Sequence, residues 1–227
     1  MPRYENKNDV NGLSHGRRCF LAGACGGLKE AKDVPFRGTW TISEENGINH
    51  ALDAQFTSEV TADKGRFRIV KTTEIRNAFG VVKEEDVSIF DGDLLSQSAK
   101  MWRENVEGAS DLEMPQQPPQ APQKPSPAAL RAARFWVHDE WLVGLPKKGP
   151  GGQVAGRETV YYEGKKTRPD GEITLRVWAD SESGMILKSI SMIYSSQVNA
   201  MVMRVTQECR KIEFAPVDAA VFAEPKS

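Results

Sequence analysis

Apolar and polar residues alternate along much of the chain, in two long stretches. In the first stretch the alternation runs through residues 36–42 and 52–60 and recurs further along. Because side chains of a strand point alternately to its two faces, a period of two predicts antiparallel strands with one buried face and one solvated face. Turn sequences at 45–47, 63–65 and 91–93 separate the runs, so this stretch predicts a meander of short strands.

A second meander is predicted in the last third of the chain. Its four or five strands cover residues 154–163, 173–180, 185–195 and 198–214. Between the two meanders, residues 128–145 combine good helix formers with an apolar stripe, which predicts one helix. Ser126 is placed to cap this helix, and Pro127 suits its first turn. The order of elements therefore predicts a mainly β (α+β) protein.

The N-terminal segment differs in composition from the rest of the chain. Residues 1–32 carry six basic and three acidic residues, a net charge of +3. The arginine pair at 17–18 precedes a stretch of small and apolar residues that resembles a twin-arginine export leader, and Cys25 follows a small-x-small cleavage sequence. The alternatives are a lipid-modified Cys25, or a disordered start that leads into a short helix at 28–34. We divide the chain into a leader and a single domain, 33–227.

A segment rich in proline and glutamine, residues 114–127, is the second break in composition. It holds six of the 13 prolines and four glutamines. Such a segment favours extended, solvated conformations. We interpret it as a long loop inside the domain, because neither flank has the pattern of a complete domain. A linker between two domains is the alternative.

The composition limits the functions that are open to the chain. Its 227 residues include 30 basic and 31 acidic ones, and this balance lacks the basic excess of a dedicated nucleic-acid-binding protein. Three His and three Cys are too few and too scattered for a zinc finger or a disulfide scaffold. No motif of a nucleotide-binding loop or a serine hydrolase occurs. We therefore expect a protein that is not an enzyme and needs neither a metal nor a cofactor.

Two groups of ionisable residues invite a catalytic or metal-binding interpretation. His138, Asp139 and Glu140 are neighbours in the predicted helix, so they point to different sides and cannot converge on one metal ion. A hydrolase would need two facing carboxylates, which the acids between residues 84 and 93 would have to supply. These acids are Glu84, Glu85, Asp86, Asp91 and Asp93. We rank a hydrolase below two binding hypotheses, which are given at the end of this subsection.

Apolar side chains of the predicted sheet and helix supply the candidate binding site. Methionine is flexible and polarizable, and it suits surfaces that accept varied apolar ligands. A sheet that curves over a single helix leaves an apolar groove, because one helix cannot fill the concave face. The candidate residues are Trp40, Phe56, Phe67, Trp136, Trp141, Met192, Met201 and Met203. Their alternative role is to fill an ordinary core.

Four segments match a known family pattern. They are FRGTWTI at 36–42, VAGRETV at 154–160, RVWADSESGMILK at 176–188, and the closing segment 211–225. In this order they resemble the opening strand, a later strand, the most recognisable hairpin and the closing strand of the LolA-like proteins, the outer-membrane lipoprotein-sorting carriers and their relatives. The likeness spans roughly residues 28–225 and is strongest from 154 onward.

The resemblance implies an open, strongly curved antiparallel sheet, a half-barrel, with a helix packed in its concave face. Members of this family carry lipid-modified polypeptides or sense hydrophobic ligands outside the cytoplasm. It therefore implies a periplasmic, or otherwise extracytoplasmic, carrier of an acyl chain or a lipoprotein, which we expect to be a monomer. The second hypothesis is a sensor or interaction module that uses the same sheet to contact an envelope protein or a membrane surface.

Overall fold

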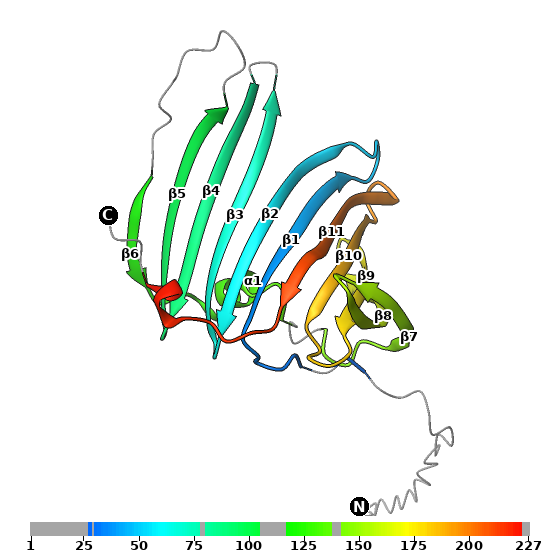
Figure 1. Cartoon of the computed structure of the whole chain (residues 1–227). Helices are drawn as coiled ribbons and strands as arrows, with labels where there is room; N and C mark the ends of the chain where they lie inside the picture. Colours follow the sequence, from blue (N-terminus) through cyan, green and yellow to red (C-terminus); the bar gives the residue numbers. More distant parts are fainter. Residues whose placement is uncertain (1–26, 29, 78–79, 105–116, 138–141, 224–227) are drawn as a thin grey trace, which may run out of the picture.

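One large sheet makes up most of the protein. The computed structural model describes residues 27–28, 30–77, 80–104, 117–137 and 142–223. Within these residues eleven strands form a single antiparallel sheet in the order β6-β5-β4-β3-β2-β1-β11-β10-β9-β8-β7 (Figure 1). The strands are β1 (Phe36–Asn46), β2 (Leu52–Asp63), β3 (Arg66–Asn77), β4 (Gly80–Asp91), β5 (Leu94–Glu104), β6 (Gln117–Gln123), β7 (Lys147–Val154), β8 (Arg157–Arg168), β9 (Gly171–Asp180), β10 (Ile186–Ser195) and β11 (Ala200–Glu213).

The two predicted meanders are halves of this one sheet. The first supplies β1 to β5 and the second supplies β8 to β11, and β1 and β11 pair with each other. Strand β7 lies before the predicted second meander, in a segment for which the sequence pattern predicts no strand. In that pair Trp40 lies opposite Cys209, so residues far apart in the sequence meet at the middle of the sheet. Since β6 and β7 lie at the two ends of the strand order, the sheet is not closed. The prediction of a mainly β protein with an open antiparallel sheet is confirmed.

The predicted helix is present but much shorter than expected. Helix α1 covers Pro127–Ala133, and the Ser126 hydroxyl accepts a hydrogen bond of 3.1 Å from the Ala129 amide, as the capping pattern predicts. The expected extension to residue 145 is wrong, because the backbone leaves helical geometry at Arg134 (φ −89°, ψ 50°). The Trp136 carbonyl beyond it accepts a hydrogen bond from the Ile186 amide. None of the described helices is long and apolar enough to cross a bilayer.

The segment predicted as a Pro/Gln-rich loop includes strand β6, which the sequence pattern does not predict. It pairs with β5 through three register positions, Leu95 with Gln123, Gln97 with Gln120, and Ala99 with Gln117, with irregularities between them. Proline has no amide hydrogen to donate, which confines such a strand to the edge of a sheet. The prolines of β6 therefore fit the outermost position that it occupies.

The described end of the predicted leader is extended rather than helical. Leu28 is buried, its amide donates to the Leu145 carbonyl at 2.9 Å, and its carbonyl accepts from the Gly144 amide at 2.9 Å. Further along, the Lys32 amide donates to the Ser183 carbonyl. These backbone partners take the place of the helical bonds expected for 28–34. The other features of the leader, including Cys25 and the arginine pair, lie outside the described residues.

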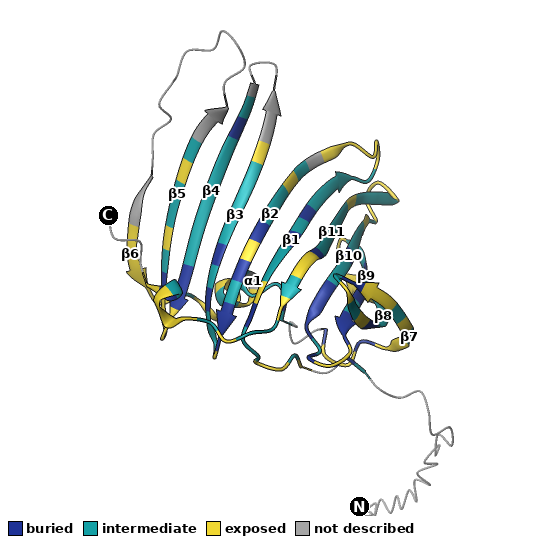
Figure 2. Ribbon diagram, viewed as in Figure 1, coloured by how far each residue is buried: buried dark blue, intermediate teal, exposed yellow. Residues whose placement is uncertain are grey.

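An aromatic cluster forms the main core beside α1. Trp136 lies edge-on to Phe36, Phe67 and Phe135, with ring centroids 5.7, 5.7 and 5.2 Å apart. Trp40 adds edge contacts to two of the same rings. Edge-to-face geometry brings the positive rim of one ring to the negative face of the next, so it stabilises the cluster beyond area burial alone. Figure 2 shows buried stretches toward the lower ends of several neighbouring strands.

A buried carboxylate fixes the turn between β9 and β10. The Asp180 side chain is 1% exposed, and it accepts two hydrogen bonds from the Arg157 guanidinium, at 2.9 and 3.3 Å. It also accepts from the Ser183 amide and hydroxyl, at 2.8 and 2.7 Å. Burial raises the pKa of the Asp180 carboxyl, but these hydrogen bonds and the charge of Arg157 outweigh burial and hold that pKa below its ordinary value.

Candidate functional site

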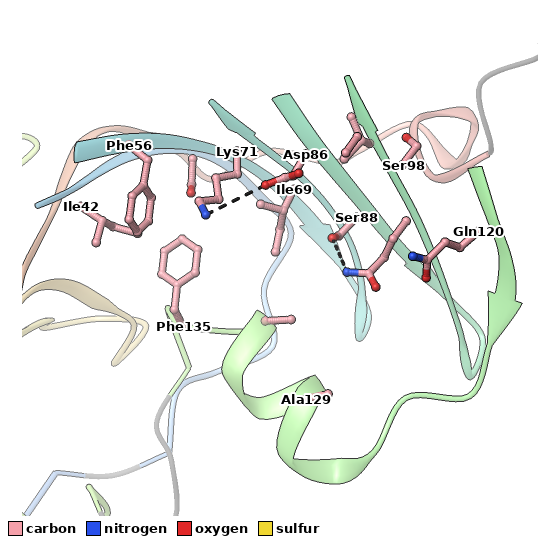
Figure 3. A pocket seen from close by; sticks show the side chains of 15 residues that line it. Ile42, Phe56, Ile69, Lys71, Asp86, Ser88, Ser98, Gln120, Ala129 and Phe135 are labelled. Carbon is pink, nitrogen blue, oxygen red and sulfur yellow. Dashed lines mark hydrogen bonds and ion pairs between the residues drawn. The ribbon is translucent and has the colours of Figure 1, made fainter. Parts of the chain in front are cut away.

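A groove of about 710 Å³ lies between α1 and the strands of the first meander. Its walls come from β1 to β6 on one side, and from α1 and the residues after it on the other (Figure 3). Strand β1 contributes Ile42 and β2 contributes Phe56, and these two residues lie opposite each other in the register, so they face the groove from the same side of the sheet.

One part of the groove is apolar. Ile42, Phe56 and Ile69 line it from the sheet, and Ala129, Ala133 and Phe135 line it from the other side. Ala129 and Ala133 are four residues apart, so they lie on one face of α1. Their methyl groups are too short to fill the space in front of the sheet, which explains why the groove remains beside a closely packed aromatic core.

The remaining wall is polar and carries two charges. Lys71 on β3 and Asp86 on β4 lie opposite each other in the register, with Nζ and Oδ2 4.0 Å apart. Both side chains are 38% exposed, so solvent weakens this pair. The Lys71 ammonium also lies 4.4 Å from the centre of the Phe56 ring, where the negative ring face attracts it. Further along, the Gln97 amide donates to the Ser88 hydroxyl at 3.3 Å (Figure 3).

The acids of the hydrolase hypothesis do not converge in this groove. Asp86 lines it, whereas its neighbour Glu85 points to the other face of β4 and pairs with Lys100 at 2.8 Å. Glu84, two residues before Asp86 on the same strand, is not among the residues that line the groove. Asp91 is the exposed last residue of β4, and Asp93 lies in the exposed turn after it. Among the described residues Asp86 is thus the only carboxylate that lines the groove, and no group of three or more His, Cys, Asp or Glu could hold a metal ion.

The four aromatic candidates that the structure describes divide between the groove and the core. Phe56 lines the groove. Trp40, Phe67 and Trp136 are 0%, 0% and 2% exposed and belong to the aromatic core rather than to the groove lining. Trp141 lies outside the described residues. The structure therefore brings three of these side chains together, but as core.

The methionine candidates divide between the two faces of the sheet. Met203 on β11 pairs with Ile193 on β10, while Met192 pairs with Arg204, the next residue along β11. Because adjacent residues of a strand face opposite ways, Met192 and Met203 lie on opposite faces. Met201 lies two residues before Met203, near the end of the same strand, and none of the three methionines lines the groove.

Cys209 lies inside the core beside Trp40. It is 2% exposed, and its thiol donates to the Lys211 carbonyl at 3.2 Å. Burial raises the pKa of this thiol to about 12. A protonated thiol is a poor nucleophile, so this geometry makes Cys209 an inert core residue at neutral pH.

Sequence reasoning missed most of the groove. Ile42 and Ile69 share the alternation that marked Phe56, so the pattern contained the signal for the apolar part. It had no signal for Lys71 and Asp86, whose meeting depends on the register between β3 and β4.

Comparison with protein-family models finds no match, and comparison with curated proteins finds none either.

Proposed function

We propose that the protein is a non-catalytic binding protein that holds an acyl chain, free or as part of a lipoprotein, in the groove between α1 and the sheet. The observation that carries the proposal is the division of the groove into an apolar part and a polar part. The apolar part, with Phe56 and Phe135 on opposite sides, suits a hydrocarbon chain. The polar part, with Lys71 and Asp86, suits the head group to which such a chain is attached.

The size of the groove supports a ligand of this kind. Its volume of about 710 Å³ lies within the range of about 300–1,000 Å³ that is typical of small-molecule sites. A purely apolar ligand would leave Lys71 and Asp86 without water and without a ligand partner, which costs free energy. An amphipathic ligand avoids that cost, because its polar end can accept from the ammonium or donate to the carboxylate.

The packing of α1 also supports a more specific proposal for the fold. We take the sheet as a strongly curved half-barrel and α1 as the helix packed in its concave face, in support of which Leu130 and Ala133 pack against the aromatic core. This arrangement, together with the resemblance of 154–225 to the LolA-like proteins, supports a periplasmic or other extracytoplasmic location, in which the protein would meet acyl chains or lipoproteins.

Replacing Ala129 by Trp tests the groove directly. Ala129 lines the groove and is itself exposed, so the larger side chain can occupy the groove without disturbing the core. We expect the affinity for a fluorescent fatty acid to fall at least about tenfold, which corresponds to a loss of about 1.4 kcal/mol of binding free energy. Titration of the probe fluorescence against wild-type and variant protein measures the change.

The matched control is Ala220→Trp, which adds the same ring at an exposed position of the short 3-10 helix Ala219–Phe222, away from the groove lining. We expect this variant to bind the probe as the wild type does. Equal affinities for all three proteins would place the probe outside the groove, and no binding by the wild type would remove the acyl-chain proposal.

A further inference from the structure

Strongly exposed apolar side chains gather at one end of the sheet. Among the described residues, five of the seven large hydrophobic side chains that are exposed lie at or beside the tips of the β1–β2 and β10–β11 hairpins. They are Ile48 (67% exposed), Leu52 (55%), Val198 (57%), Tyr194 (39%) and Met203 (38%). We call these five residues the tip patch. Single exposed apolar residues are ordinary, but such a concentration marks an interaction surface.

The two hairpin tips lie side by side, so the tip patch is one surface. Asn46 lies opposite Met203 in the register between β1 and β11. One residue further, the Gly47 amide donates to the Val202 carbonyl at 3.1 Å. A β-carbon on Gly47 would lie 2.3 Å from the Met201 carbonyl oxygen, so glycine permits this close approach of the two tips. Figure 2 shows both tips as exposed ends of neighbouring strands.

Both tips lack charged residues. Residues 46–52 and 195–203 contain no Asp, Glu, Lys or Arg, although these types make up 27% of the whole chain. The first charged residues inward are Asp53 on β2, next to Leu52, and Glu45 and Arg204, whose side chains face each other across β1 and β11 at 3.6 Å. Since charged residues are the most costly to bring into lipid, their absence from both tips favours an apolar or zwitterionic partner over a charged one.

The backbone amides of the first tip have hydrogen-bond partners within the protein. The Asn46 side-chain oxygen accepts from the Ile48 amide at 2.9 Å and from the Asn49 amide at 3.3 Å. The Asn49 side-chain oxygen accepts from the Ala51 amide at 2.9 Å. A loop whose amides are already paired loses fewer hydrogen bonds to water when it leaves water, so this tip can enter a lipid environment at low cost.

We propose that the tip patch docks the protein onto a lipid bilayer, with Ile48, Leu52 and Val198 inserted among the head groups and the tops of the acyl chains. Projecting hairpin tips with apolar side chains and no Asp, Glu, Lys or Arg, one of them with paired amides, fit this layer, where the gain comes from burying apolar area rather than from attraction to anionic lipid. The docking does not depend on what the groove binds, because none of these three residues lines the groove.

Co-sedimentation of the full chain with neutral phosphatidylcholine vesicles tests the proposal. We expect the wild type to sediment with the vesicles at low salt and at about 1 M salt, since screening weakens only electrostatic binding. We expect Ile48→Ser combined with Val198→Ser to lower the partition coefficient about tenfold, because each side chain loses part of its favourable burial. Both positions are exposed in the free protein, so both substitutions should leave the fold intact.

The chain supplies a matched pair of leucines as a control. Leu52 is the first residue of β2, in the tip patch, and is 55% exposed, while Leu94 is the first residue of β5, at the opposite end of the sheet, and is 48% exposed. We expect Leu52→Ser to weaken vesicle binding severalfold and Leu94→Ser to leave it unchanged. Equal loss from both, absence of binding by the wild type, or loss of binding in high salt would overturn the proposal.

Size-exclusion chromatography distinguishes the lipid surface from a second copy of this chain. We expect a monomer in the absence of vesicles for the wild type and for Ile48→Ser/Val198→Ser. A wild-type dimer that the double substitution dissociates, without vesicle binding, would assign the tip patch to self-association and contradict docking on lipid. The fatty-acid titration of the groove is independent of both results, so failure of one proposal leaves the other intact.

Discussion

Trp136→Ala is expected to lower the free energy of unfolding by about 3–5 kcal/mol, the range for removal of a buried aromatic side chain. Trp136 is 2% exposed and its ring contacts Phe36, Phe67 and Phe135. Alanine would leave a cavity between the segment after α1 and the sheet, because Phe36 and Phe67 belong to strands that the hydrogen-bond ladder holds in place. Urea denaturation followed by circular dichroism measures the loss.

Trp136→Phe is the control for this substitution. Phenylalanine keeps one aromatic ring in the cluster, so we expect Trp136→Phe to lower the free energy of unfolding by less than half as much as Trp136→Ala does. A loss below about 1 kcal/mol for Trp136→Ala would show that Trp136 is not packed between α1 and the sheet, and it would remove the basis for the position of the groove.

Asp180→Ala is expected to lower the free energy of unfolding by about 3 kcal/mol, the low end of the range for breaking a buried ion pair. The low end applies because the Arg157 side chain is 30% exposed, so water can accept some of the hydrogen bonds that the guanidinium would otherwise donate to Asp180. The substitution also leaves the Ser183 amide and hydroxyl without their acceptor. Urea denaturation measures the loss of unfolding free energy, and Asp170→Ala is the control.

Asp170 makes the same type of pair in an exposed place. It accepts two hydrogen bonds of 3.0 Å from Arg168 and its side chain is 59% exposed, so its loss should cost no more than about 1 kcal/mol of unfolding free energy.

The pH dependence of stability gives a second test of the buried Asp180–Arg157 pair. Because the folded state holds the pKa of Asp180 low, its contribution is present above about pH 4 and is lost as the pH falls through the folded-state pKa. The difference between wild type and Asp180→Ala should therefore narrow in acid, and a constant difference would contradict the buried pair.

The strands could be predicted because each carries its own signal. Alternation over 36–42 and 52–60, with turn sequences between the runs, is a local property, and β1 and β2 include these residues. The pairing of β1 with β11 is not local, because no property of residues 36–46 alone specifies a partner more than 150 residues away. The sequence therefore predicts two meanders, and the structure is needed to show that they are one sheet.

The helix and β6 show where tertiary contacts outweigh local preference. Residues 134–137 have helical periodicity, yet burial of Trp136 among Phe36 and Phe67 ends the helix at Ala133. The segment 117–123 has a composition typical of loops, yet the free edge of β5 offers hydrogen bonds that an extended chain can use. Propensity is a weak prior in both cases, since the partner lies elsewhere in the chain.

The site was harder to predict than the fold, for a physical reason. Large aromatic residues fill space, so Trp40, Phe67 and Trp136 became core. A groove is lined where side chains are too small to fill the space, and Ala129 and Ala133 mark it. Small residues on a helix have many roles, so only the packing of α1 against the sheet shows which of them leave a cavity.

Native mass spectrometry of the full chain, purified without detergent and then mixed with an excess of a single long-chain fatty acid, tests the central claim most directly. The proposed function predicts a complex with one bound fatty acid per chain. It also predicts that Ala129→Trp lowers the bound fraction, whereas Ala220→Trp keeps it. A spectrum that shows only the mass of the bare chain under these conditions, or equal binding by Ala129→Trp and the wild type, would contradict the assignment of the groove as an acyl-chain site.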